Sequence, residues 1–256
     1  MRRAPSATTS AATRRGPAGT QGARPRARVL VLALAGLLAA LFSGPSSAAA
    51  DDDAATPANR RAAKVLERLD AIAGNLTETR YQHRTKIRAR DGLYYWDCSA
   101  MAAYIIAKVA PAARKALTRE RPVARDFYQV IRDAPTRGDR DGWRRLPSIR
   151  DVRPGDVFAW KRPKDFPSKN TGHVGFVLEA PAPAPEWPGA YLVRIADATS
   201  LPHQDDTRER DSDGGFGHGT ILFLTDENGR GIAYGWFGAR SRGVITTPIA
   251  FGRLIR

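Results

Sequence analysis

Residues 97–109 read DCSAMAAYIIAKV, and this stretch is predicted to form a helix around which the rest of the fold packs. The apolar side chains fall almost all round such a helix, at Met101, Ala102, Tyr104, Ile105, Ile106 and Val109. A helix that is apolar on every side is typical of one buried in a protein core. Pro111 lies just beyond the predicted end of the helix, where proline is tolerated. Asp97 and Cys98 therefore stand at the N-terminal end of a buried helix.

Helical patterns come first along the chain and strand patterns follow. A helix is predicted over residues 57–73, with Thr56 as its N-cap, and a third over residues 124–132. Residues 76–95 are expected to be extended or irregular, and residues 135–150 to form a loop. Strands are indicated at 156–160, 173–178, 191–196, 220–224, 232–236 and within 244–251. This order predicts one α+β domain over residues 51–256, with N-terminal helices packed on an antiparallel β-sheet.

The first 50 residues differ in composition from the rest. They hold seven Arg and no acidic residue, then the apolar run VLVLALAGLLAALF at 29–42, then small residues that end in AAA at 48–50. This order is typical of a basic leader and a secretory signal peptide, cleaved near Asp51. The apolar run has 14 residues, fewer than the roughly 20 that cross a bilayer, so no stable membrane span is expected after cleavage. We expect an exported protein, periplasmic or extracellular.

The charge of the expected mature chain indicates its surroundings more than its chemistry. Residues 51–256 hold 34 Lys and Arg against 26 Asp and Glu, a formal net charge of +8. This balance suits an anionic surface such as a cell wall. The basic residues are scattered and no nucleic-acid-binding motif is present, so nucleic acid is not an expected partner. We expect a monomer.

Cys98 is the only cysteine of the chain, so it cannot form an internal disulfide. A thiol attacks as the thiolate, and the unpaired N–H groups at a helix N-terminus favour that anion. Its position at a helix start therefore favours a reactive thiol. A small buried core residue is the alternative for a lone cysteine.

His173 and Asp197 are the candidate partners of the thiol. His173 opens an apolar strand between two glycines, Gly172 and Gly175, which would allow another backbone or a substrate to approach closely. Asp197 follows the apolar run of the next strand, so antiparallel pairing would bring it to the end of the sheet where His173 lies. A carboxylate there could orient an imidazole base. The alternatives are a hydrogen-bonded His at a sheet edge and an Asp that caps a strand end.

These motifs resemble those of the NlpC-like cysteine peptidases. The resemblance rests on Asp97-Cys98-Ser99 at a helix start, then RPGD at 153–156 before a strand, then GHVG at 172–175 on the next strand. It covers about residues 93–200. Ala100 stands where the family usually has Gly, and Asp197 where it more often has His. The family is a papain-like superfamily of exported enzymes, many of which cut the peptide stems of peptidoglycan.

The resemblance implies a role for each of these residues. Cys98 would be the nucleophile, His173 the base and Asp197 the third member, with His203 as an alternative third member. Tyr95, or its neighbour Tyr94, would help to hold the peptide together with Asp97 and Ser99. The backbone N–H of Cys98, with Tyr95, would form the oxyanion hole. The implied activity is hydrolysis of an amide bond in a cell-wall peptide, without a cofactor.

Other interpretations remain beside this one. An amidase or acyltransferase could use the same fold and the same thiol. A non-catalytic cell-wall-binding protein is the alternative from a different class. The polar residues His203, Asp205, Asp206 and His218 match no standard metal-site spacing, so we expect a polar loop and no metal there.

Overall fold

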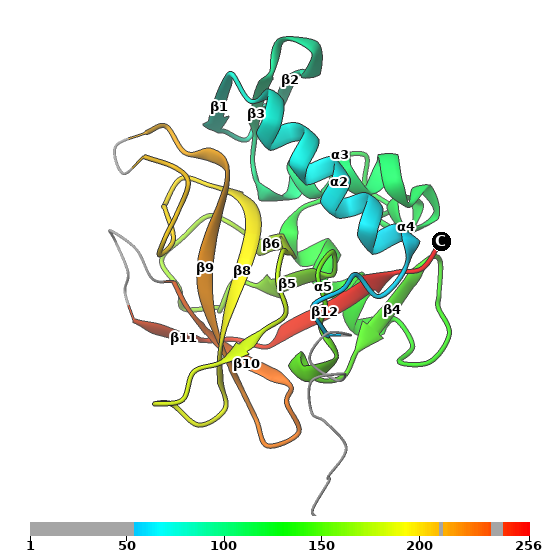
Figure 1. The fold of residues 1–256 in the computed structure, drawn as a ribbon, viewed down its shortest axis with the longest axis vertical. Helices are drawn as coiled ribbons and strands as arrows, with labels where there is room; N and C mark the ends of the chain where they lie inside the picture. The colour runs from blue at the N-terminus through cyan, green and yellow to red at the C-terminus, as the bar shows by residue number, and fades with distance from the viewer. Residues whose placement is uncertain (1–53, 210–211, 237–242) are drawn as a thin grey trace, which may run out of the picture. The chain divides into compact units, whose positions relative to one another are not determined.

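The computed structural model describes residues 54–209, 212–236 and 243–256 (Figure 1). The expected leader and signal peptide at 1–50 lie outside the described residues. Four α-helices are described, and all of them precede the large sheet in the chain: α2 (Arg60–Asn75), α3 (Cys98–Val109), α4 (Pro111–Ala116) and α5 (Ala124–Asp133). Short 3₁₀ turns occur at Ala89–Asp91 and Ile149–Asp151.

The helix starts follow local capping chemistry. The side chain of Asn59 accepts hydrogen bonds from the N–H groups of Arg61 and Ala62, so α2 begins at Arg60 rather than after Thr56 as predicted. Asp97 caps α3 in the same way and accepts from Ala100 N–H at 2.8 Å. A short helix, α4, starts at Pro111, where proline is favoured because its missing N–H would be unpaired in any case.

A nine-stranded antiparallel sheet forms the C-terminal part of the described chain. The strand order is β11-β10-β9-β8-β6-β5-β12-β4, with β7 paired to β8 off this path. The strands are β4 (Trp143–Leu146), β5 (Val157–Lys161), β6 (Gly172–Val177), β7 (Ala182–Pro183), β8 (Ala190–Thr199), β9 (Gly215–Thr225), β10 (Gly231–Gly235), β11 (Val244–Thr246) and β12 (Ile249–Leu254). The α+β prediction is confirmed. The prediction of a loop at 135–150 was wrong in part, because this segment contains β4, which pairs with the late strand β12.

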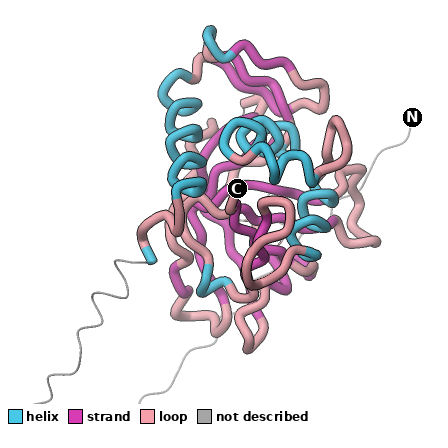
Figure 2. The backbone as a smooth tube through the Cα atoms, turned by 90° about the vertical axis from the view of Figure 1, so that its right-hand side faces the viewer, coloured by secondary structure: helices cyan, strands magenta, loops and turns pink. Residues whose placement is uncertain are grey.

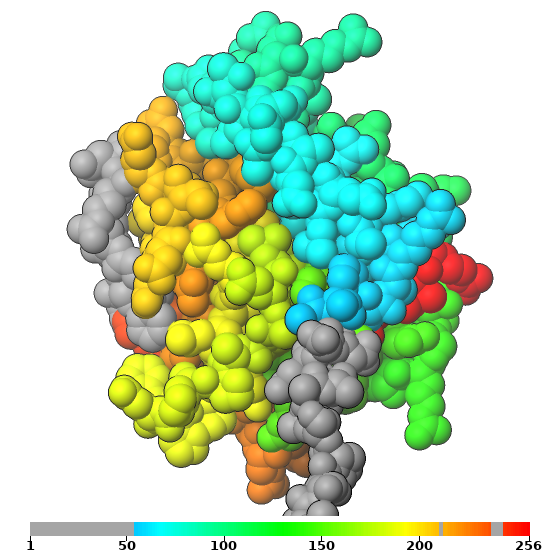
Figure 3. All heavy atoms as spheres, in the orientation of Figure 1, coloured from blue at the N-terminus to red at the C-terminus, as the bar shows by residue number. Residues whose placement is uncertain are grey.

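A separate three-stranded sheet fills much of the segment that was expected to be extended or irregular. It consists of β1 (Glu78–Tyr81), β2 (Lys86–Arg88) and β3 (Leu93–Trp96), in the order β1-β3-β2. The hydroxyl of Thr79 accepts a hydrogen bond from Phe216 N–H at 2.8 Å, which joins this small sheet to the start of β9. Figure 3 shows its teal residues directly above the yellow and orange residues of β8 and β9.

Two apolar clusters lie on either side of the large sheet. The first joins the helices to one face of the sheet, and the second holds the large side chains of the other face. Strand β5 shows this division residue by residue, because Val157 and Ala159 belong to the first cluster and Phe158 and Trp160 to the second. Figure 2 shows the helices gathered beside the strands of the sheet. The fully buried face of α3 thus fixes the position of Cys98 relative to the sheet.

The described residues belong to one compact unit, Pro45–Arg256. Among them, no helix has the length and apolar character that crossing a membrane requires.

Candidate active site

Cys98 is the first residue of α3 and is 5% exposed. Asp97 occupies the N-cap, and its second carboxylate oxygen lies 3.0 Å from Nδ1 of His83. The hydroxyl of Ser99 lies 3.8 Å from the Cys98 sulfur, and Ser99 is itself buried. The predicted placement of the thiol at the start of a buried helix is confirmed. Ser99 is a buried neighbour of the sulfur.

His173 lies near the beginning of β6, opposite Trp160 of β5. Its ring contacts the side chains of both Cys98 and Asp197. The ring of Trp236 meets the imidazole edge-on at 5.0 Å between centroids. A methyl group at Gly175 would lie 2.7 Å from the ring of Phe158 and 2.9 Å from the carbonyl oxygen of Ala196. Gly175 therefore allows close packing inside the sheet, as expected of a glycine within a strand that a neighbouring backbone approaches closely.

Asp197 is a fully buried carboxylate with three partners. One oxygen, Oδ2, lies 2.6 Å from Nε2 of His173 and 2.8 Å from Nε2 of His203. The other, Oδ1, accepts from the guanidinium of Arg208. The predicted contact between Asp197 and His173 is present, since strands β6 and β8 pair antiparallel with Phe176 opposite Ala196. Asp197 lies inside β8 and not at its end as expected, because pairing with Gly217 extends the strand to Thr199.

Two groups act on the imidazole of His173. Asp197 lies 2.6 Å from its Nε2, and the thiol of Cys98 is also a hydrogen-bond partner of the ring. Burial lowers the pKa of His173, but the negative charges of Cys98 and Asp197 and the hydrogen bonds to them outweigh burial and raise it to about 9. Burial also raises the pKa of Asp197, yet His203, Arg208 and His173 hold it well below its ordinary value. The arrangement therefore favours an ionised carboxylate beside a protonated imidazole.

Tyr81 of β1, rather than the predicted Tyr95, lies close to Cys98. Burial raises the pKa of Tyr81, and the negative charges of Cys98, Asp97 and Asp197 raise it further, so its hydroxyl stays protonated. Tyr95 bonds Glu78 instead, and the cationic groups of Arg80 and Lys86 lie over its ring. The alternation of β3 explains the difference, because Tyr94 and Trp96 point into the core and Tyr95 must point the other way.

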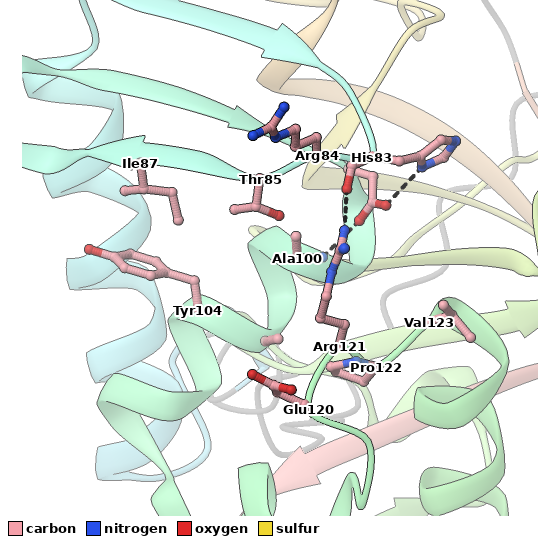
Figure 4. A pocket seen from close by; sticks show the side chains of 12 residues that line it. His83, Arg84, Thr85, Ile87, Ala100, Tyr104, Glu120, Arg121, Pro122 and Val123 are labelled. Atoms are coloured by element: carbon pink, nitrogen blue, oxygen red, sulfur yellow. Dashed lines mark hydrogen bonds and ion pairs between the residues drawn. The ribbon is translucent and has the colours of Figure 1, made fainter.

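A cavity of about 720 Å³ opens beside the N-cap of α3. Ala100, Ala103 and Tyr104 of α3 form an apolar wall, and Asp97 lies in its lining. Figure 4 shows Glu120 and Arg121 on the loop side, with the guanidinium of Arg121 reaching the backbone oxygen of His83. The cavity therefore offers apolar surface and charges of both signs next to the residue that precedes the thiol.

A metal could be considered at His173, Asp197 and His203, whose candidate ligand atoms all lie within 4.8 Å of one another. Nε2 of His173 and Nε2 of His203 both lie at hydrogen-bond distance from Oδ2 of Asp197. The guanidinium of Arg208 donates to the other carboxylate oxygen, Oδ1. A guanidinium in that position opposes a second cation. The hydrogen-bonded arrangement accounts for all of these short contacts.

The raised pKa of His173 predicts a loss of stability at alkaline pH. An unfolded His titrates near 6.5, so the stabilisation from this group is fully present below pH 6.5 and is lost as the pH rises through about 9. We expect the stability difference between the wild type and His173→Gln to shrink by on the order of 1–3 kcal/mol across that range. Urea unfolding followed by tryptophan fluorescence at several pH values measures it. A difference that stays constant from pH 6 to 9.5 would contradict this linkage.

Comparison with known proteins gives one relative and no family. No protein-family model matches the chain, and no solved structure matches it. The uncharacterized protein R653 of Acanthamoeba polyphaga mimivirus is 29% identical over 212 residues, which cover 69% of this chain and 88% of that protein. The name of this relative assigns it no activity.

Proposed function

We propose that this protein is a cysteine hydrolase of amide bonds, with a papain-like arrangement of helix and sheet. The observation that carries the proposal is the contact of His173 with both Cys98, at the start of a buried helix, and the buried carboxylate of Asp197. A nucleophile, a base and an orienting acceptor in that order make up the arrangement of nucleophilic acyl transfer.

The residues suggest the following sequence of steps. His173 takes the proton of the Cys98 thiol, and the thiolate attacks the carbonyl carbon of the amide. The C–N bond then breaks, and the amine leaves with a proton from His173. Water, deprotonated by His173, attacks the thioester and releases a carboxylic acid and the thiol. The N–H groups of Cys98 and Ser99 have no partner within the helix, so they are the candidate donors to the oxyanion.

The proposed substrate is a peptide of the cell wall. The cavity beside Asp97 combines an apolar wall with acidic and basic groups, which suits a peptide that carries free amino and carboxyl groups. Tyr81 and Asp97 are the candidates to hold its amino group, Tyr81 in place of Tyr95. The positive charge of residues 51–256 suits an anionic wall around the substrate.

Digestion of purified peptidoglycan, followed by mass spectrometry of the soluble products, tests this function. We expect the protein to release stem fragments in which one amide has gained the elements of water. The Cys98→Ala protein serves as the control and should release none.

The other products would identify the alternatives. Fragments joined to an added amine, without gain of water, would indicate an acyltransferase. Wall binding by both proteins with no product from either would overturn the enzymatic proposal and favour a wall-binding protein.

A further inference from the structure

The loop between β8 and β9 contains Arg208, which belongs with His173, Asp197, His203 and Asp206 to one buried hydrogen-bonded cluster. The side chain of Arg208 is 2% exposed, and each of its guanidinium nitrogens has a partner. One nitrogen donates to the carboxylate and to the carbonyl of Asp197, the latter at 2.8 Å. The others donate to the carbonyl of Gly215 at 2.9 Å and to Asp206 at 2.6 Å. A guanidinium so fully bonded has one fixed position.

His203 of the same loop approaches the other oxygen of the carboxylate. Its Nε2 lies 2.8 Å from Asp197 Oδ2, the oxygen that also meets His173. The indole of Trp236 stacks on the imidazole of His203, with 4.0 Å between the ring centroids. Its backbone N–H donates to Asp206 at 2.7 Å, so Asp206 holds both His203 and Arg208.

Alternate glycines of β9 make room for this loop. A methyl group at Gly217 would lie 2.7 Å from Cγ and Nε of Arg208, and one at Gly219 would lie 2.5 Å from Cβ of His203. Strand residues two apart share a face of the sheet, so these glycines form a trough in which both side chains lie. The glycine-rich segment at 214–219 thus has a role in building the site.

We propose that Arg208, supported by His203 and Asp206, is a positioning residue that keeps Asp197 ionised and directed at His173. A buried carboxylate without a cation tends to take up a proton. A protonated Asp197 would no longer stabilise the imidazolium of His173. The thiolate of Cys98 depends on that imidazolium, so Arg208 acts on the nucleophile through two intermediate residues. The inference rests on the proposed function only in its assignment of Cys98 as the nucleophile.

Other charged groups also face the cluster. Asp97 and Tyr81 approach from the α3 and β1 side, and Asp206 from the loop. Arg208 supplies the positive charge that contacts Asp197 most directly apart from the two imidazoles. Removing it should therefore change the titration of the Cys98–His173 pair more than it changes the rest of the site.

The rate of iodoacetamide alkylation of Cys98 as a function of pH tests this role without any substrate. We expect Arg208→Gln to raise the pH of half-maximal alkylation by about one unit, with a roughly tenfold slower rate below the plateau. Arg208→Lys keeps the charge but not the fixed geometry, so its pH of half-maximal alkylation should lie between those of the wild type and Arg208→Gln. Arg253→Gln serves as the matched control, since Arg253 pairs with the buried carboxylate of Asp156 at 2.8 Å and lies outside the cluster.

The control should lose thermal stability and keep the wild-type pH profile. If Arg208→Gln and Arg208→Lys also keep that profile and lose only stability, Arg208 is a structural residue and the proposal is overturned. If Arg208→Gln does not fold, Arg208→Lys decides by the same criterion. If Arg208→Gln shifts the pH profile of alkylation but the wild-type protein cleaves no peptide, the proposed function is overturned and the positioning role of Arg208 stands.

Discussion

Cys98→Ala is expected to abolish amide hydrolysis, with a loss of about 10⁶-fold in kcat, because removal of a covalent nucleophile removes the path through the thioester. The unfolding free energy should fall by only about 1 kcal/mol, since alanine leaves a cavity no larger than one sulfur atom at a site 5% exposed. Turnover of a purified stem peptide and urea unfolding measure the two effects. The contrast between them separates a chemical role from a packing role.

Cys98→Ser is the matched chemical control for that experiment. It retains a polar group of similar shape at the helix start, but a hydroxyl gives up its proton far less readily than a thiol. We expect folded protein with turnover reduced by at least about 10³-fold. Iodoacetamide should label the wild type and neither variant. Hydrolysis that persists in Cys98→Ala would assign the reaction to another group and leave Cys98 as a buried core residue.

The sequence predicted the parts of the site that depend on local pattern. Cys98 at a helix start follows from the apolar side chains that surround the helix at 98–109, and the contact of His173 with Asp197 follows from the antiparallel pairing of β6 with β8. Both predictions use neighbours in sequence or in the sheet. The period of a helix or strand is enough to make them.

The loop residues required long-range information. Arg208 lies in a polar loop, and nothing in its neighbours shows that its guanidinium turns back under β8. The signal that could have found it is the alternation of Gly215, Gly217 and Gly219, because glycine at every second residue of a strand indicates a close approach on one face. The family resemblance pointed to Tyr95 or its neighbour Tyr94, next to the DCS motif, and Tyr81 was not predicted. The alternation of β3 would have placed Tyr95 on the outer face.

Asp197→Asn is expected to lower turnover by about 10⁴-fold, the largest effect predicted for a residue that does not touch the substrate. The amide keeps the shape of the carboxylate but has no charge to stabilise the imidazolium, and one of its two groups is a donor. That donor would face Nε2–H of His173 or the guanidinium of Arg208, so the ring loses its orientation or its tautomer. The unfolding free energy should fall by about 1–3 kcal/mol, because Asp206 still pairs with Arg208.

Asp156→Asn is the matched control for this variant. Asp156 is as deeply buried as Asp197, and its carboxylate likewise pairs with an arginine, Arg253, through bonds of 2.8 and 2.9 Å. It lies outside the cluster, so its loss should cost comparable stability and leave kcat per folded molecule within about twofold of the wild type. Equal loss of turnover in the two variants would show that a buried ion pair stabilises the fold as a whole. A loss confined to Asp197→Asn would show that the charge acts on His173, because only that carboxylate lies against the imidazole.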